Sequence, residues 1–158
     1  MLLALDVGNT NVTLGVYRET ELAGRGRLKT DPGQTADGWG ILIRNLFEAA
    51  GLETGGVHGV AIACVVPPLD SVFEEMAGRY FHTKPLFVGP GVKTGVAVLV
   101  DNPQEVGADR IVNAVAAFHK YGGPCVVADF GTAITFDAVS IRGEYLGGII
   151  CPGIGISA

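Results

Sequence analysis

The sequence has few cysteines, few basic residues and no long hydrophobic run, and each shortage excludes a class of protein. Its three cysteines, Cys64, Cys125 and Cys151, are too few for a disulfide framework and too widely spaced for a short-spaced metal site. An odd number of cysteines in apolar stretches is typical of core thiols in a reducing compartment. No apolar run approaches the ~20 residues of a membrane span, and the N-terminus lacks the pattern of a signal peptide. We therefore expect a cytoplasmic protein that has no membrane partner.

The shortage of basic residues argues against a nucleic-acid partner. Eleven Lys and Arg residues are scattered among 16 Asp and Glu, which gives a formal net charge of −5. Phosphate backbones are bound by a basic stripe or patch, and the sequence has none. What the chain does have is 48% hydrophobic residues, enough for a buried core in a globular chain of one domain or a little more.

Alternating and helical spacings of apolar residues predict an α/β fold. The first three predicted strands form a meander, and its first turn is Gly-Asn-Thr. After it, strands and helices alternate, which predicts that part of the sheet is parallel. The predicted elements are strands over 2–7, 11–17, 21–30, 57–66 and 85–89, and helices over 34–52 and 67–81.

Residues 102–122 carry the clearest helix signals in the chain. Asn102 is expected at the N-cap and Pro103 at the first helical position, Glu105 completes a capping box, and Gly122 lies beyond the end. We therefore predict one helix that begins at Pro103.

Three polar residues of this predicted helix share a face away from its apolar stripe. They are Glu105, Asp109 and Asn113, spaced four residues apart. A solvated face is one interpretation of this pattern. A binding face is the other, and Gly107 favours it, because a glycine inside a helix weakens the helix and allows a ligand to approach the backbone.

The pattern that opens the chain returns near its end. When residues 3–16 (LALDVGNTNVTLGV) and 126–139 (VVADFGTAITFDAV) are aligned at one constant offset, three pairs of identical residues match. Both segments read as an apolar strand, Asp, any residue, Gly, a polar residue and a second strand. We interpret the two as a duplicated hairpin. The matched pairs are Asp6 with Asp129, Gly8 with Gly131, and Val16 with Val139.

Two such turns together have the chemistry of a phosphate site. Gly8 and Gly131 allow the backbone to approach a bulky anion, while Asn9, Thr10 and Thr132 can donate hydrogen bonds to phosphate oxygens. The Asp before each turn can hold a cation. A single Gly-Asn-Thr turn would be explained by hairpin formation alone, and the second copy favours the phosphate site.

Other nucleotide signatures do not fit. The loop GPGVKTG over 89–95 resembles a Walker A loop, but Val92 and Phe87 occupy the positions where that loop needs glycine. No G-x-G-x-x-G follows a predicted strand, so a dinucleotide-binding fold is not indicated either.

Five segments occur in the order found in type III pantothenate kinases, which are members of the actin-like ATPase superfamily. They are DVGNTN, VVP (65–67), DNPQEVGADRIVNA, DFGTAITFD and GGIICPG (147–153), and together they span essentially the whole chain. The resemblance implies a ribonuclease-H-like (actin-like ATPase) domain over 1–115. It also implies the start of a second copy of the same fold over 116–158. Family members continue beyond CPGIGISA, so the second domain is expected to be incomplete here.

The resemblance also implies roles for the two Asp turns. Asp6 is implied to lie near the metal of Mg²⁺-ATP, and Asp129 at the site that takes a monovalent cation, K⁺ or NH₄⁺. The residues implied to lie near the ATP phosphates are Gly8, Asn9, Thr10 and Asn11 in the first turn, and Gly131 and Thr132 in the second.

The segment GADR resembles the pantothenate-binding motif of the family. By this resemblance Gly107, Ala108 and Arg110 contact the substrate, and Asp109 contacts it as the catalytic base. The guanidinium of Arg110 could pair with the carboxylate of pantothenate, or it could form a surface ion pair with Glu105 or Asp109. One departure from the family is Val100, where some members have Tyr.

The implied activity is ATP-dependent phosphorylation of pantothenate to 4′-phosphopantothenate, the first step of coenzyme A biosynthesis, in a homodimer. The alternative is a non-catalytic nucleotide-binding relative that acts as an accessory transcription regulator, and the presence of Asp6, Asp109 and Asp129 argues against it. An actin-like filament protein would share the two turns but has no reason to carry NPQEVGADR.

Overall fold

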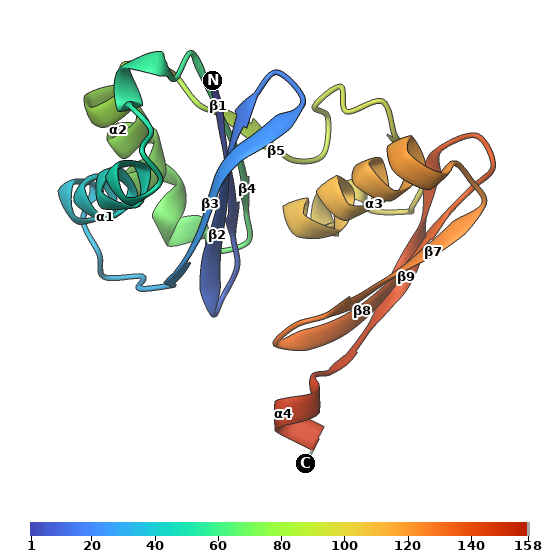
Figure 1. The fold of residues 1–158 in the computed structure, drawn as a ribbon. Coiled ribbons are helices and arrows are strands. Elements are labelled where there is room, and N and C mark those ends of the chain that lie inside the picture. The colour runs from blue at the N-terminus through green and yellow to red at the C-terminus, as the bar shows by residue number, and fades with distance from the viewer. Residues whose placement is uncertain (158) are drawn as a thin grey trace. The chain divides into compact units, whose positions relative to one another are not determined.

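The computed structural model describes residues 1–157, which fall into two compact units (Figure 1). Unit 1 is Met1–Phe87 and unit 2 is Val88–Ala158. The predicted domains, 1–115 and 116–158, were inferred from the fold of the family, and their bounds stay a prediction. Each unit is described by itself below.

Unit 1 consists of a mixed β-sheet and two helices, each of which connects two strands along the chain. The strand order is β3-β2-β1-β4-β5, with β1 antiparallel to β2 and parallel to β4. This confirms the predicted meander and the predicted parallel part of the sheet. The elements are β1 (Leu2–Val7), β2 (Asn11–Arg18), β3 (Glu21–Lys29), α1 (Ala36–Ala49), β4 (Gly59–Cys64), α2 (Asp70–Phe81) and β5 (Leu86–Val88).

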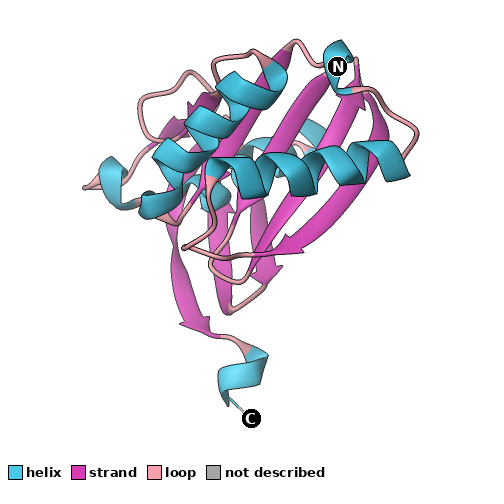
Figure 2. Ribbon diagram, turned by 90° about the vertical axis from the view of Figure 1, so that its left-hand side faces the viewer, coloured by secondary structure: helices cyan, strands magenta, loops and turns pink. Residues whose placement is uncertain are grey.

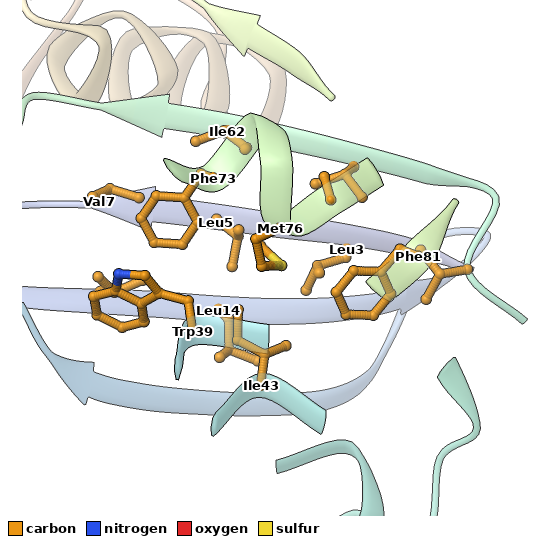
Figure 3. Packing of buried hydrophobic residues seen from close by; sticks show 14 of the residues in the cluster. Leu3, Leu5, Val7, Leu14, Trp39, Ile43, Ile62, Phe73, Met76 and Phe81 are labelled. Atoms are coloured by element: carbon orange, nitrogen blue, oxygen red, sulfur yellow. The ribbon is translucent and has the colours of Figure 1, made fainter. Parts of the chain in front are cut away.

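The core of unit 1 forms between the helices and one face of this sheet (Figure 3). Alternate residues of β1, among them Leu3 and Val7, are fully buried, whereas Asp6 is exposed because its side chain points to the other face. Trp39 of α1 packs on Phe73 of α2, with ring centroids 5.1 Å apart. The first motif residue, Asp6, is thus carried by a strand that the core holds in place.

Unit 2 contains a second sheet, in the order β6-β9-β8-β7, and one long helix (Figure 1). Helix α3 packs against β7 and β8, and β9 runs into a short C-terminal helix (Figure 2). The elements are β6 (Ala97–Val98), α3 (Ala108–Tyr121), β7 (Cys125–Phe130), β8 (Ala133–Val139), β9 (Glu144–Pro152) and α4 (Ile154–Ser157).

The predicted start of the helix over 102–122 was wrong. Pro103–Glu105 form a separate 3₁₀ turn, Val106 is extended, and α3 begins at Ala108 with Gly107 as its N-cap. Asn102 lies at the N-cap of this 3₁₀ turn but makes no side-chain capping hydrogen bond, and its side-chain amide donates a hydrogen bond to Glu105 Oε1 over 2.7 Å. Glu105 therefore lies outside α3.

The three-stranded meander of unit 1 recurs in unit 2 as β7, β8 and β9. Asp6 lies opposite Thr13 in the first hairpin, and Asp129 lies opposite Thr135 in the second. The second turn is thus one residue shorter, and the predicted match of Val16 with Val139 was wrong by one position. Register shifts fall at equivalent points, between Val16 and Tyr17 in β2 and between Ala138 and Val139 in β8.

This agreement in register and in the place of the irregularity supports a duplicated meander. That β7, β8 and β9 open a second domain of the same fold stays a prediction.

The three cysteines are free and each is partly buried. Cys64 packs against the core of unit 1, and Cys125 against the core of unit 2, as expected for thiols in apolar strands. Among residues 1–157, none of the helices combines the length and the apolar character that a bilayer span requires.

Candidate functional site

The first Asp turn joins β1 to β2 and is held by its own backbone. The Gly8 N–H donates a hydrogen bond to Asn11 O over 3.0 Å, which closes the loop around Asn9 and Thr10. Asp6 lies two residues before this loop, opposite Thr13 in β2 and Ala63 in β4. The predicted phosphate residues of this motif therefore lie together at one end of β1.

Thr30, which the sequence reasoning missed, fastens this turn to the end of β3. Its side chain is nearly buried, with 7% exposure, and its hydroxyl donates a hydrogen bond to Gly8 O over 2.6 Å. The Thr30 N–H donates to Thr10 O over 3.0 Å. A threonine after a strand is too common for the sequence to single it out. Thr30 reaches this turn through the register of β3 with β2, which the sequence does not show.

The second Asp turn has the same closure with one residue fewer. The Gly131 N–H donates to Ala133 O over 3.0 Å, and Thr132 lies between them. Gly153, directly after β9, is buried against this turn at the position equivalent to Thr30. A Cβ at residue 153 would lie 2.8 Å from Gly131 O, so only glycine lets the chain pass this close to the turn.

Asp129 precedes this second turn on β7 and is contacted from α3. Asn113 Nδ2 donates a hydrogen bond to Asp129 Oδ2 over 2.9 Å. Asn113 was predicted on a polar face with Asp109, and the structure shows that this face of α3 turns toward β7 at Asn113. This bond lies at the surface, so the solvated-face and binding-face interpretations both stay predictions.

The first turn of α3 presents the GADR segment. Gly107 O accepts hydrogen bonds from the Arg110 N–H (3.1 Å) and the Ile111 N–H (3.2 Å), so Gly107 forms the start of the helix and is not inside it. Ala108 is buried beneath this turn. The Asp109 carboxylate accepts a hydrogen bond from the Arg110 N–H over 2.8 Å, and at this position the helix dipole favours a negative charge.

The Arg110 side chain forms a partly buried ion pair that the sequence did not predict. Its Nε donates to Asp137 Oδ1 over 2.8 Å, and its Nη2 lies 2.6 Å from the same oxygen. Asp137, on β8, is fully buried, and the Arg110 side chain is only 13% exposed. The predicted alternative of a surface ion pair with Glu105 or Asp109 was therefore wrong.

The donors at the two turns fit the cations that the sequence resemblance implies. Asp6 and Asp129 offer carboxylate oxygens, the ligands that Mg²⁺ and K⁺ prefer, beside turns with backbone N–H groups for phosphate. Within residues 1–157, no cluster of three or more His, Cys, Asp or Glu side chains could hold a metal by itself. Such a donor set suits a cation that is bound together with a phosphate ligand, because the phosphate supplies the remaining oxygens.

Comparison with solved structures identifies the fold. The chain is similar to a putative N-acetylglucosamine kinase from Porphyromonas gingivalis, with a TM-score of 0.56, 16% identity, and coverage of 94% of this chain and 47% of that one. It is also similar to the activator of 2-hydroxyisocaproyl-CoA dehydratase from Clostridium difficile, with a TM-score of 0.55, 10% identity, and coverage of 96% and 45%. The fold is therefore the mixed α/β fold of actin-like ATPases.

Comparison with curated proteins and with family models identifies the family. A type III pantothenate kinase from Anaeromyxobacter dehalogenans (strain 2CP-C) is 60% identical over 157 residues, which are 99% of this chain and 62% of that protein. The chain thus spans about three fifths of the length of the relatives it matches. The family model described as type III pantothenate kinase matches residues 2–158. Both agree with the motifs placed above, and the chain belongs to the type III pantothenate kinase family.

Proposed function

We propose that this protein transfers the γ-phosphoryl group of ATP to the primary hydroxyl of pantothenate. The product is 4′-phosphopantothenate, and the reaction opens coenzyme A biosynthesis. One observation carries the proposal: the family match runs from residue 2 to residue 158 and therefore includes both Asp turns and the start of α3. No observation on this chain favours the alternative of a non-catalytic transcription regulator.

In this proposal the two Asp turns bind the phosphates of ATP. Phosphoryl transfer through a loose transition state needs mainly positioning and neutralisation of charge, which backbone N–H groups and cations provide. The Gly8–Asn11 loop and the Gly131–Thr132 loop donate hydrogen bonds to the phosphate oxygens. Asp6 holds the Mg²⁺ that accompanies ATP, and Asp129 holds K⁺ or NH₄⁺. These cations neutralise charge on the phosphates when they are bound.

The acceptor side is formed by the first turn of α3. Asp109 orients the primary hydroxyl of pantothenate and accepts its proton late in the transfer, as a carboxylate within hydrogen-bond reach can do. Arg110 donates N–H groups to the carboxylate of pantothenate, and Gly107 and Ala108 leave room beside the backbone. We further propose that the protein works as a cytoplasmic homodimer.

Release of ADP, measured with and without pantothenate, tests this function. The assay is run on residues 1–158 and on an extended chain, in which residues 1–158 continue into the part of the Anaeromyxobacter dehalogenans relative beyond the matched region. Turnover of the extended chain that requires pantothenate is the expected result. ATP binding by the extended chain without pantothenate-dependent turnover would overturn the proposal and favour the non-catalytic alternative.

A further inference from the structure

A buried polar cluster in unit 2 joins Arg110 to two residues that have no role in the scheme above. Its members are Asp137 on β8, Tyr145 on β9 and the side chain of Arg110 on α3. Asp137 and Tyr145 are buried, with exposures of 0% and 1%. A charged carboxylate is almost never fully buried unless it is paired, so this cluster calls for an explanation.

Three interactions of Asp137 converge on one of its oxygens. Oδ1 accepts hydrogen bonds from Arg110 Nε (2.8 Å) and from the Tyr145 hydroxyl (2.7 Å), and it lies 2.6 Å from Arg110 Nη2. The Tyr145 ring lies beside the guanidinium, with Arg110 Cζ 5.9 Å from its centroid. Arg110 is thus fixed by a counter-charge and by an aromatic ring.

The backbone of β9 makes room for this cluster. Gly148 lies opposite Asp137 in the register of β8 and β9. A Cβ at residue 148 would lie 2.5 Å from Arg110 Nη2 and 2.6 Å from Asp137 Oδ1. A side chain at 148 would strike the ion pair and also the backbone oxygen of Phe136, so glycine at this position leaves room for both.

The local electrostatics keep Arg110 and Tyr145 each in one protonation state. Burial is the largest effect on Arg110 and lowers its pKa, but the hydrogen bond and the ion pair with Asp137 outweigh it and raise the pKa above its usual value. Burial, and after it the hydrogen bond to Asp137, raise the pKa of Tyr145. Arg110 therefore stays charged and Tyr145 stays a hydrogen-bond donor throughout the physiological range.

We propose that Asp137 and Tyr145 are positioning residues that aim Arg110, and with it the first turn of α3, at the acceptor substrate. This inference rests on the proposed function, in which Arg110 donates to the carboxylate of pantothenate. A guanidinium has five N–H donors, and Asp137 uses those on one edge, so the other edge is held in a fixed direction. Asp109 is the neighbouring residue, so the same anchor limits how far its backbone can move.

The test compares Tyr145→Phe with Arg110→Lys and with the double variant, all in the extended chain. Tyr145→Phe keeps the ring but removes the hydroxyl that donates to Asp137. Tyr121→Phe is the matched control, because Tyr121 is 75% exposed at the end of α3. The kinetic constants for pantothenate and for ATP are measured separately, and unfolding curves verify that each variant is folded.

We expect Tyr145→Phe to raise the KM for pantothenate about tenfold and to leave the KM for ATP and the control unchanged. In the Arg110→Lys background the same substitution should change the KM for pantothenate by less than about twofold. The guanidinium that Tyr145 helps to position is no longer present in that background. Equal effects of Tyr145→Phe in both backgrounds would overturn the inference, as would an unchanged KM.

A spectroscopic measurement on the extended chain separates this inference from the proposed function. The Arg110 Nε–H signal in a ¹H–¹⁵N spectrum should exchange slowly with water in the parent chain, and about tenfold faster in Asp137→Asn and in Tyr145→Phe. Equally fast exchange in the parent chain would contradict the anchor itself. If exchange behaves as expected while pantothenate supports no turnover, the anchor stands and the assigned substrate fails.

Discussion

Asn113 on α3 donates a hydrogen bond from Nδ2 to Asp129 Oδ2 over 2.9 Å. This bond joins the helix that begins with the GADR segment to the strand that ends at the second Asp turn. A carboxylate that binds a cation is oriented by such a partner, and loss of the partner weakens cation binding. Helix α3 therefore carries the candidate acceptor residues at its start and contacts the candidate cation residue, Asp129, through Asn113.

The first prediction concerns this bond. Asn113→Ala in the extended chain should raise the potassium concentration that gives half-maximal activity by about tenfold, because Asp129 loses its fixed orientation. His119→Ala, an exposed change further along α3, is the control. An identical potassium response of Asn113→Ala and the parent chain would remove the link between Asn113 and the cation.

The second prediction concerns Thr30 and the first turn. Thr30→Val keeps the shape of the side chain but removes the hydroxyl that donates to Gly8 O, so it should lower the free energy of unfolding by about 1–2 kcal/mol. Thr30→Ser retains the hydroxyl and should cost less. Urea denaturation of the extended chain measures both. Equal losses for the two variants would show that the methyl group matters and the hydrogen bond does not.

The third prediction concerns the pH dependence of stability. Burial, and after it the hydrogen bond with Asp70, raise the pKa of the Cys64 thiol to about 12. The folded state therefore holds this proton more tightly than the unfolded state, whose thiol has its ordinary pKa of 9.0. The resulting stabilisation is complete below pH 9 and is lost as the pH rises toward 12.

Urea midpoints between pH 8 and pH 12 check this dependence. The parent chain should lose stability relative to Cys64→Ser over this range, because serine does not titrate there. Cys125→Ser serves as the control for loss of a thiol. A constant difference between the parent and Cys64→Ser at every pH would contradict the raised pKa.

The fourth prediction concerns the face of the second sheet that α3 does not cover. By the register of the two meanders, Val126 and Phe130 on β7 are equivalent to Leu3 and Val7, which the helices of unit 1 bury. In residues 1–158, Val126 and Phe130 are 68% and 66% exposed, and Ile149 on β9 is 60% exposed. Exposed apolar strands promote association and low solubility.

Residues 1–158 alone should therefore associate and dissolve poorly. Val126→Thr combined with Ile149→Thr should raise the soluble fraction, while Leu22→Thr on β3 should not. The soluble fraction of each variant is compared, and light scattering of the soluble protein measures its association. A soluble monomer of the unchanged chain would contradict this prediction.

Local sequence signals predicted most elements of unit 1 but misplaced the start of α3. The helix signals at Asn102, Pro103 and Glu105 are real, yet they build a separate 3₁₀ turn, because Val106 adopts an extended conformation with φ −77° and ψ 119°. A cap signal describes a preference for starting a turn and does not say whether the turn continues. Gly107 then starts α3.

Contacts between distant segments were beyond the reach of sequence patterns. Arg110 and Asp137 are 27 residues apart, and their pairing depends on how α3 packs across β8. Similarly, the repeat was found by its Asp and Gly residues, but its offset by one residue became visible only in the strand register. The residue types of the candidate site could be predicted, whereas the residues that support them required the structure.

Asp109 is the base for a pantothenate hydroxyl in the proposed reaction, and the kinetics of Asp109→Asn in the extended chain test this role most directly. The substitution keeps the shape of the side chain and removes its ability to accept a proton. A general base contributes about 10²–10⁴-fold, so the account predicts a fall in kcat of that size, with ATP binding nearly unchanged and Asp101→Asn as an active control. Parent-level turnover in Asp109→Asn, or an equal loss of ATP binding, would contradict it.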